Sequence, residues 1–295
     1  MISKNIVIAA LARDCEDSLR NNIPLIEELR THFSWSAVVV VENDSVDGTK
    51  SLLAEWQANF KDVTIISNDF GTKTIPDKKD VEVDPWTSFG RIEKMARYRN
   101  FYLEHISKIV HPIDLVIIID IDIIDISIKG LLDVINHFDD KTGAIFSNGV
   151  SVKQTPFGLS RVYYDIFAVW EYPYEGEFSH SRDSQARTFK SINKNLKKKS
   201  FYPVISAFGG VGVYNYQAIK NLHYKTVANP LNQLEAICEH IPFNHEIIKR
   251  GFKNFIARDF QVIYQRHSWV LILKMVLPGR VFRVLHPVLL RFKRR

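Results

Sequence analysis

Two aspartates follow an apolar run, and their spacing suits metal binding. Residues 115–119 are all apolar, which is typical of a strand that is buried on both faces. Asp120 and Asp122 come next, and side chains two residues apart in an extended segment point the same way. Carboxylates held that close repel each other, and a hard cation such as Mg²⁺ or Mn²⁺ removes the conflict. The spacing predicts a metal site for a phosphate-bearing substrate; the alternative is a solvated strand end.

The elements before this stretch alternate between apolar strands and helices. We expect strands at residues 5–11, 37–41 and 63–66, with a helix after each of the first two. A β–α–β–α–β order implies parallel strands joined by right-handed crossovers. We therefore expect an α/β fold with a mostly parallel central sheet flanked by helices.

Polar residues occupy the ends of these predicted strands. In parallel sheets, ligands bind beyond the carboxyl ends of the strands, which meet at one edge. Several separate loops that bring polar groups to one edge indicate a site more strongly than any single loop. The polar residues at these ends are Arg13, Glu42, Asp44, Asp47, Asp120 and Asp122.

A helix expected at residues 89–105 carries a group of basic and amide side chains. Arg97 and Asn100 are three residues apart and lie on one helical face, with Arg99 between them. An arginine here is suited to contact a diphosphate through two hydrogen bonds. The alternative is a basic helix that faces solvent.

Three later segments complete the globular part. Residues 161–173 are rich in aromatics and include Asp165, which suits sugar binding, although a packed core segment fits the same residues. We expect a polar basic loop at 191–200. Residues 202–214 are β-like and contain three glycines, which mark either bulges or a close approach of the backbone to a ligand.

The composition is that of a globular protein. Of the 295 residues, 46% are hydrophobic and 24% are charged. Cys15 and Cys238 are far apart in sequence, which is no disulfide framework and favours a reducing compartment. The net charge of +6 arises at the C-terminal end, because residues 260–295 contain no Asp or Glu. The basic character therefore does not indicate a nucleic-acid partner.

The last 28 residues, 268–295, mix apolar and basic side chains. Such amphipathic segments lie in the membrane interface with their cations on anionic lipid, although a helix packed on the domain has the same pattern. We expect a globular domain at 1–267, divided at about residue 125 into a nucleotide-binding half and an acceptor-binding half. The tail predicts a peripheral location on the cytoplasmic face of a membrane.

These segments together resemble GT-A fold (Rossmann-like) glycosyltransferases. The resemblance is carried by residues 42–49, 97–100 and 120–122. The order of the segments is also similar to the capsule-associated α-1,3-mannosyltransferase family, which has a Tyr-Asp aromatic segment and a Pro-Val-Xaa-Ser segment. Here these correspond to 164–165 and 203–206, and the resemblance covers roughly residues 5 to 267.

The resemblance implies sugar transfer from a GDP- or UDP-sugar to a hydroxyl of a glycan or lipid-linked acceptor, in surface polysaccharide or lipopolysaccharide synthesis. It implies Mn²⁺ or Mg²⁺ at Asp120 and Asp122, with His267 completing the metal shell. It also implies that Arg97 or Arg99 lies near the diphosphate. The residues assigned to the nucleotide sugar are Arg13, Glu42, Asp44, Asp47, Arg97, Arg99, Asn100 and Asp120.

The choice of a catalytic base depends on the stereochemical course. An inverting reaction needs a carboxylate or histidine to deprotonate the acceptor. Glu239 or His240 is the first candidate and Asp165 the second. A retaining reaction requires no such base, and these residues then position the acceptor.

Two further functions fit an α/β sheet with paired carboxylates. One is a non-catalytic nucleotide- or sugar-binding protein on the same fold. The other is a metal-dependent nucleotidyltransferase, for which we expect a glycine-rich phosphate loop after the first strand. Residues 9–13 contain no glycine, which disfavours the nucleotidyltransferase and a dinucleotide-binding dehydrogenase alike.

Overall fold

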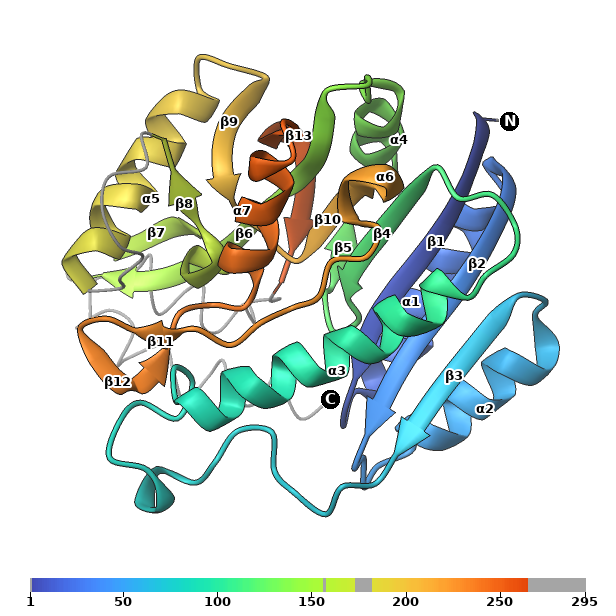
Figure 1. Ribbon diagram of the computed structural model, residues 1–295, viewed down its shortest axis with the longest axis horizontal. Helices are drawn as coiled ribbons and strands as arrows, with labels where there is room; N and C mark the ends of the chain where they lie inside the picture. The colour runs from blue at the N-terminus through green and yellow to red at the C-terminus, as the bar shows by residue number, and fades with distance from the viewer. Residues whose placement is uncertain (1, 156–157, 173–181, 265–295) are drawn as a thin grey trace, which may run out of the picture.

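A twisted sheet with helices on both faces forms the body of the molecule (Figure 1). The computed structural model describes residues 2–155, 158–172 and 182–264. His267 and the amphipathic tail at 268–295 lie outside these residues, so the predictions made for them stay predictions. Of the helices within the described ranges, none has both the length and the apolar character needed to cross a bilayer.

Eleven strands of the described chain form one sheet, whose main path runs β3-β2-β1-β4-β10-β6-β13-β9-β8. β5 pairs with β13, and β7 pairs with β6. The first four strands pair in parallel, as the sequence predicts, whereas β10 is antiparallel to both β4 and β6. The strands are β1 (Ile2–Ala12), β2 (Phe33–Asn43), β3 (Val63–Asn68), β4 (Leu115–Asp120), β5 (Asp125–Ile126), β6 (Thr142–Thr155), β7 (Gly158–Tyr163), β8 (Trp170–Glu171), β9 (Phe201–Ser206), β10 (Val211–Asn215) and β13 (Lys253–Ile263).

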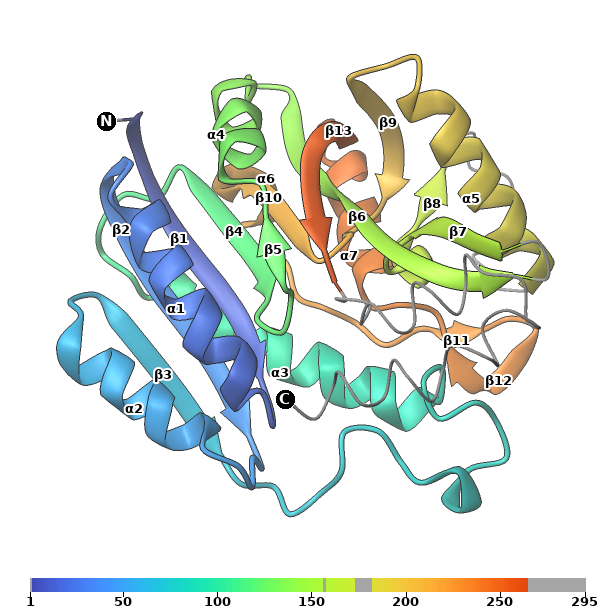
Figure 2. The same cartoon turned by 180° about the vertical axis from the view of Figure 1, so that it is seen from behind.

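The helices form a layer on each face of the sheet. Figure 2 shows α1, α2 and α4 in front of one face, and Figure 1 shows α3, α6 and α7 in front of the other. A small hairpin, β11 (Ala228–Asn229) with β12 (Asn232–Ala236), lies beside the start of α3 (Figure 1). The helices are α1 (Glu16–Arg30), α2 (Thr49–Asn59), α3 (Phe89–Ser107), α4 (Ile128–Asn136), α5 (Arg182–Leu196), α6 (Tyr216–Ile219) and α7 (His240–Lys249), with short 3₁₀ turns η1 (Lys78–Asp80) and η2 (Ile166–Ala168).

The central strands are apolar on both sides because each face is covered. In β4, Val116 and Ile118 pack into the cluster under α3 and α7, whereas Ile117 and Ile119 pack into the cluster under α1, α2 and α4. All four side chains are at most 4% exposed. The continuous apolar run of β4 is thus explained by the alternation of side chains in a strand with two buried faces.

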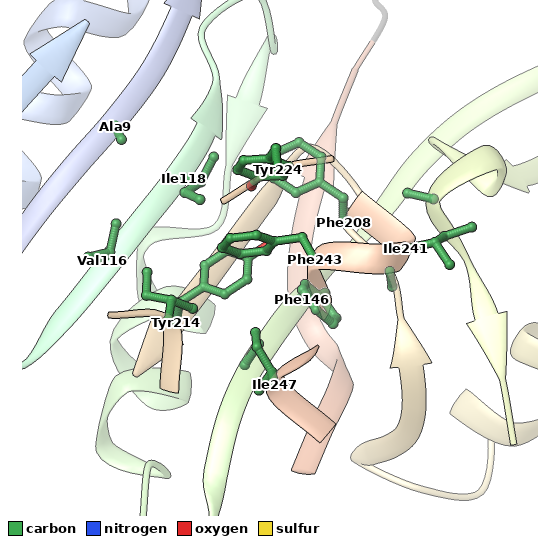
Figure 3. Packing of buried hydrophobic residues seen from close by; sticks show 14 of the residues in the cluster. Ala9, Val116, Ile118, Phe146, Phe208, Tyr214, Tyr224, Ile241, Phe243 and Ile247 are labelled. Carbon is green, nitrogen blue, oxygen red and sulfur yellow. The ribbon is translucent and has the colours of Figure 1, made fainter. Parts of the chain in front are cut away.

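Aromatic rings fill the space between β10 and α7 (Figure 3). Tyr224 stacks on Phe243 with ring centroids 4.1 Å apart, and Tyr214 meets Phe243 edge-on at 6.0 Å. All three rings are buried. This packing fixes α7, and with it the residues just before α7, against the centre of the sheet.

The sequence-based assignment of secondary structure needs two corrections. Residues 191–200 were expected to form a loop, but α5 continues to Leu196 because Phe189, Ile192 and Leu196 face the core at helical spacing. The β-like segment 202–214 is two strands, β9 and β10, separated by a glycine turn. The predicted α/β class with a mostly parallel sheet is confirmed, and the sheet runs without a break through both predicted halves.

The glycine turn between β9 and β10 brings backbone against backbone. Gly209 has a φ of +68°, and a Cβ there would lie 2.4 Å from the carbonyl oxygen of Ser147 in β6. The Ser147 hydroxyl also donates to the Gly209 carbonyl at 2.7 Å. Only glycine combines this backbone conformation with this close approach.

We expect Gly209→Ala to lower the free energy of unfolding by more than ~2 kcal/mol, because a left-handed φ and a clash with Ser147 add together. Gly71→Ala is the matched control, because Gly71 has a φ of +63° but no atom within 4 Å of its added Cβ. The control should lose only ~1 kcal/mol. Urea unfolding of both variants tests this, and equal losses would show that the close approach is unimportant.

Candidate functional site

The turn that contains Asp120 and Asp122 is held rigidly at the carboxyl end of β4. The Asp120 amide donates to the Gly210 carbonyl at 2.8 Å. The buried side-chain amide of Asn22, from α1, donates to the carbonyls of Ile121 and Ile123, both at 2.7 Å. Sequence analysis overlooked Asn22, although a polar residue among the apolar positions of a helix was a signal. The turn is therefore fixed before any ligand binds.

The two carboxylates of this turn lie close enough to affect each other. Burial and then the neighbouring Asp122 carboxylate raise the pKa of Asp120 to about 7. The hydroxyl of Tyr164 donates to Oδ2 of Asp120 at 3.1 Å, and that of Tyr264 donates to Oδ2 of Asp122 at 3.4 Å. Asp122 is exposed to solvent, so the pair is accessible from outside.

The carboxylate oxygens of this turn are suitable ligands for a hard divalent cation. Two repelling carboxylates offer oxygen ligands on one accessible edge, which is the chemistry that Mg²⁺ and Mn²⁺ prefer. Within the residues described by the structure, no group of three or more His, Cys, Asp or Glu side chains is placed to hold a metal. Asp120 and Asp122 would act as protein ligands, with water and substrate phosphate among the others. His267, which is predicted to complete the metal shell, lies outside the described residues.

A buried ion pair lies beside the carboxylates. Nε of Arg99, in α3, is 2.9 Å from Oε1 of Glu239, and the two side chains are only 6% and 4% exposed. The Arg99 guanidinium also lies over the rings of Phe208 and Tyr224, at 5.4 and 5.6 Å from their centroids. Burial opposes its charge, but Tyr102 and Glu239 more than offset this, so the pKa of Arg99 is raised. The pair joins α3 to the start of α7.

Asp165 lies near both the carboxylate pair and the ion pair. It has a left-handed backbone, with φ 59°, immediately before η2. Burial raises the pKa of Asp165 well above its ordinary value, and the charges of Asp120 and Glu239 raise it further. A carboxyl group in such surroundings is a stronger base than an ordinary aspartate.

His240 is enclosed in the core next to the ion pair. Its ring stacks on Phe208 at 4.2 Å and is 1% exposed. Neither ring nitrogen has a hydrogen-bond partner among the residues that the structure describes. Burial, followed by the charge of Arg99, lowers the pKa of His240 well below its ordinary value. His240 is therefore a neutral imidazole at physiological pH.

The loop after β2 is braced from within. Glu42 is fully buried and accepts hydrogen bonds from the Ser45 amide at 2.8 Å and from the Ser67 hydroxyl. Asp47 accepts from the amides of Glu16 and Thr49, at 3.1 and 3.0 Å, and so connects this loop to the start of α1. These two carboxylates hold the loop in shape.

Asp44 and Arg13 lie together at the ends of β2 and β1. Asp44 accepts from the Gly71 amide at 2.7 Å, and hydrogen bonds from Asn43, Gly71 and Phe70 lower its pKa although its burial opposes this. Nη1 of Arg13 is 4.0 Å from Asp44 and donates to Thr72 and Thr74, both at 2.9 Å. Both side chains tie the segment after β3 to this edge.

The other predicted residues of α3 lie elsewhere. Arg97 is exposed, with its guanidinium 4.5 Å from the centroid of the Phe70 ring. Asn100 donates to the Tyr224 carbonyl at 3.0 Å and accepts from the Tyr224 amide at 2.7 Å. The structure therefore brings Asp120, Asp122, Asp165, Arg99, Glu239 and His240 to one region, and places Arg13, Glu42, Asp44 and Asp47 at the adjoining strand ends.

Comparison with known proteins identifies one family and a shared fold. The family profile described as cryptococcal mannosyltransferase 1 matches residues 5–243. No curated protein sequence matches the chain. The fold is similar to that of the mannosyltransferase PcManGT from Pyrobaculum calidifontis in complex with GDP-Man and Mn²⁺, with a TM-score of 0.51 and 13% sequence identity. This match covers 98% of the chain but 63% of PcManGT, so the chain spans less than two thirds of that protein.

Two other similar structures are more distant. Glucosyl-3-phosphoglycerate synthase from Mycobacterium tuberculosis, in complex with UDP, has 12% identity and covers 90% of this chain and 72% of its own. TarS 1-349 from S. aureus has 13% identity, and the match covers 88% of this chain and 59% of the TarS chain. Both TM-scores are 0.44, too low to add to the assignment. The match to PcManGT confirms the predicted GT-A fold.

The burial of neutral His240 predicts a dependence of stability on pH. Its pKa is lower in the folded chain than in the unfolded chain, so below about pH 6.5 the unfolded chain binds the extra proton. Its stabilising contribution is complete above that pH and is lost at about 1.4 kcal/mol per unit as the pH falls. Relative to wild type, His240→Phe should therefore gain stability steadily between pH 6.5 and 5.

Urea unfolding across pH 5 to 8 measures this difference. His223→Gln, which replaces a histidine at an exposed position, is the matched control over the same pH range. If the difference between His240→Phe and wild type is the same at pH 5 and pH 8, His240 is not held neutral in the core.

Proposed function

The chain belongs to the cryptococcal mannosyltransferase 1 family, a family of glycosyltransferases, and we propose that it transfers a hexose from a nucleotide sugar to a hydroxyl acceptor. One observation carries this proposal. Asp120 and Asp122 stand on a rigid, accessible turn at the carboxyl end of β4, where ligands of such sheets bind. A divalent cation held by this carboxylate pair would suit a substrate with a diphosphate.

Asp120 and Asp122 are the proposed ligands of a Mn²⁺ or Mg²⁺ ion. When bound, such an ion stabilises the negative charge that develops on a departing nucleoside diphosphate. Asp122 is exposed, so the site is accessible from solvent, and Asn22 keeps the turn in place. At the neighbouring strand ends, Arg13 and Asp44 are the proposed contacts of the nucleoside. Arg99 is paired with Glu239, so its proposed role is to hold α3 against the start of α7 beside the site.

The proposed donor is GDP-mannose, with other GDP- or UDP-sugars as alternatives. Support comes from the mannosyltransferase family and from the carboxylate pair, which suits any nucleoside diphosphate sugar. The proposed acceptor is a glycan or a lipid-linked saccharide at the cytoplasmic face of a membrane. The composition of residues 260–295, which contain basic but no acidic residues, supports this location.

Asp165 is the proposed acceptor-side base in an inverting reaction, ahead of Glu239 and His240. Its raised pKa and its position near Asp120 suit the acceptance of a proton from a hydroxyl group. Glu239 is engaged by Arg99, and His240 is enclosed against Phe208. In a retaining reaction Asp165 would instead position the acceptor hydroxyl.

Asp122→Asn should lower Mn²⁺-dependent turnover of GDP-mannose by ~100-fold or more, because the site loses half of its protein charge. The fold should be retained, since Asp122 is exposed. Asp125→Asn is the matched control: it makes the same change of charge three residues away, on an exposed position of β5, and should keep near-wild-type turnover. Radiolabelled donor assays with and without Mn²⁺ give the comparison. Full activity of Asp122→Asn would refute the metal assignment.

Asp165→Asn should lower transfer to the acceptor by ~100-fold or more if the reaction inverts, because the amide cannot accept the proton. Binding of the donor with Mn²⁺ should change little. Steady-state transfer and donor affinity, measured on the same preparation, separate the two effects. Transfer within threefold of wild type would remove Asp165 as the base.

A further inference from the structure

We propose that a stacked tyrosine pair, Tyr164 and Tyr264, positions the carboxylates of Asp120 and Asp122 for the cation. This inference rests on the proposed function and deepens it. The sequence-based prediction of the site gave no role to either tyrosine. Both are positioning residues, since they act through the carboxylates.

The two rings form one rigid unit although they come from distant parts of the chain. Their centroids are 3.9 Å apart and their planes differ by 12°. Tyr164 follows β7 and Tyr264 follows β13, which pair with β6 on its two sides. The Tyr164 amide donates to the Gly149 carbonyl at 3.0 Å, and the Tyr264 amide donates to the Val150 carbonyl at 3.2 Å. Two consecutive residues of β6 therefore set the register of the stack.

Each ring serves a different carboxylate. The Tyr164 hydroxyl donates to Oδ2 of Asp120 at 3.1 Å, and the Tyr264 hydroxyl donates to Oδ2 of Asp122 at 3.4 Å. Nearly parallel rings hold their hydroxyls side by side, which matches two carboxylates on neighbouring outward positions of one turn. Each carboxylate keeps its second oxygen for another partner.

The chemistry of the hydrogen-bond donor explains why tyrosine suits these two positions. A lysine or arginine at either position would neutralise a carboxylate and compete with a cation. A tyrosine hydroxyl restricts the rotation of the carboxylate but leaves its charge intact. Partners of this kind, which contact the ligands and not the metal, typically change metal affinity by about 10–100-fold when they are removed.

The test is the affinity for Mn²⁺ of the full chain, measured by electron paramagnetic resonance without substrate. Tyr164→Phe and Tyr264→Phe remove each hydroxyl and keep the stacked rings. We expect about tenfold weaker binding for Tyr164→Phe, a smaller loss for Tyr264→Phe because its contact is longer, and a larger loss for the double variant. Tyr216→Phe is the matched control and should bind like wild type. Tyr216 begins α6, and its amide donates to the Asp114 carbonyl just before β4, at the end of that strand away from Asp120.

The melting temperature of the metal-free variants distinguishes positioning from packing. A packing role would lower the melting temperature and leave the Mn²⁺ affinity unchanged, and this result overturns the inference. If wild type binds Mn²⁺ well and the double variant binds it within twofold of wild type, the proposed role of the tyrosine pair fails and the metal site stands. If wild type binds no Mn²⁺ either, the metal site of the proposed function fails together with the pair.

Discussion

The repulsion between Asp120 and Asp122 is the interaction around which the structure is arranged. Two carboxylates at the end of a buried strand would separate if their turn were free to move. Asn22 and Gly210 hold the backbone of that turn, and the pKa of Asp120 rises to about 7 as a consequence of burial and repulsion. The hydrophobic packing on both faces of β4 stabilises the fold and offsets the unfavourable repulsion. A bound cation would relieve this repulsion, which is the physical basis of the proposed metal site.

Two other carboxylates near the site are compensated within the protein, whereas Asp165 shares the unfavourable surroundings of Asp120. Glu239 is matched by Arg99 in a buried ion pair, and Asp47 is satisfied by backbone amides. His240 stays neutral against Phe208. Among these groups, the turn after β4 is where a counter-charge is most needed. This asymmetry, and not the number of acidic residues at the edge, marks the turn as the place for a ligand.

The part of the fold that depends on local pattern could be predicted from the sequence. The apolar runs of β1, β2 and β4 indicated parallel strands, and the spacing of Asp120 and Asp122 indicated a shared direction at a strand end. The resemblance to GT-A glycosyltransferases and to a mannosyltransferase family is confirmed by the family match and the fold. The end of α5, residues 191–196, was mistaken for a loop because its lysine and asparagines obscured the helical spacing of Ile192 and Leu196.

Contacts between distant residues could not be read from the sequence. Arg99 meets Glu239 140 residues later, and Asn22 reaches carbonyls about 100 residues away. These contacts depend on which strands become neighbours, and the antiparallel insertion of β10 between β4 and β6 has no local signature. The roles of individual site residues, the metal and the division into two halves therefore stay predictions and proposals.

We propose that the turn after β4 binds a nucleotide sugar together with a divalent cation. It is tested most directly by thermal unfolding of the full chain with GDP-, UDP-, CMP- and dTDP-sugars, each with and without Mn²⁺. A ligand that binds the native state raises the melting temperature, and at a fixed concentration a tighter ligand raises it more. We expect one donor to stabilise the protein strongly, and only when Mn²⁺ is present. No shift with any donor, or an equal shift without Mn²⁺, would contradict it.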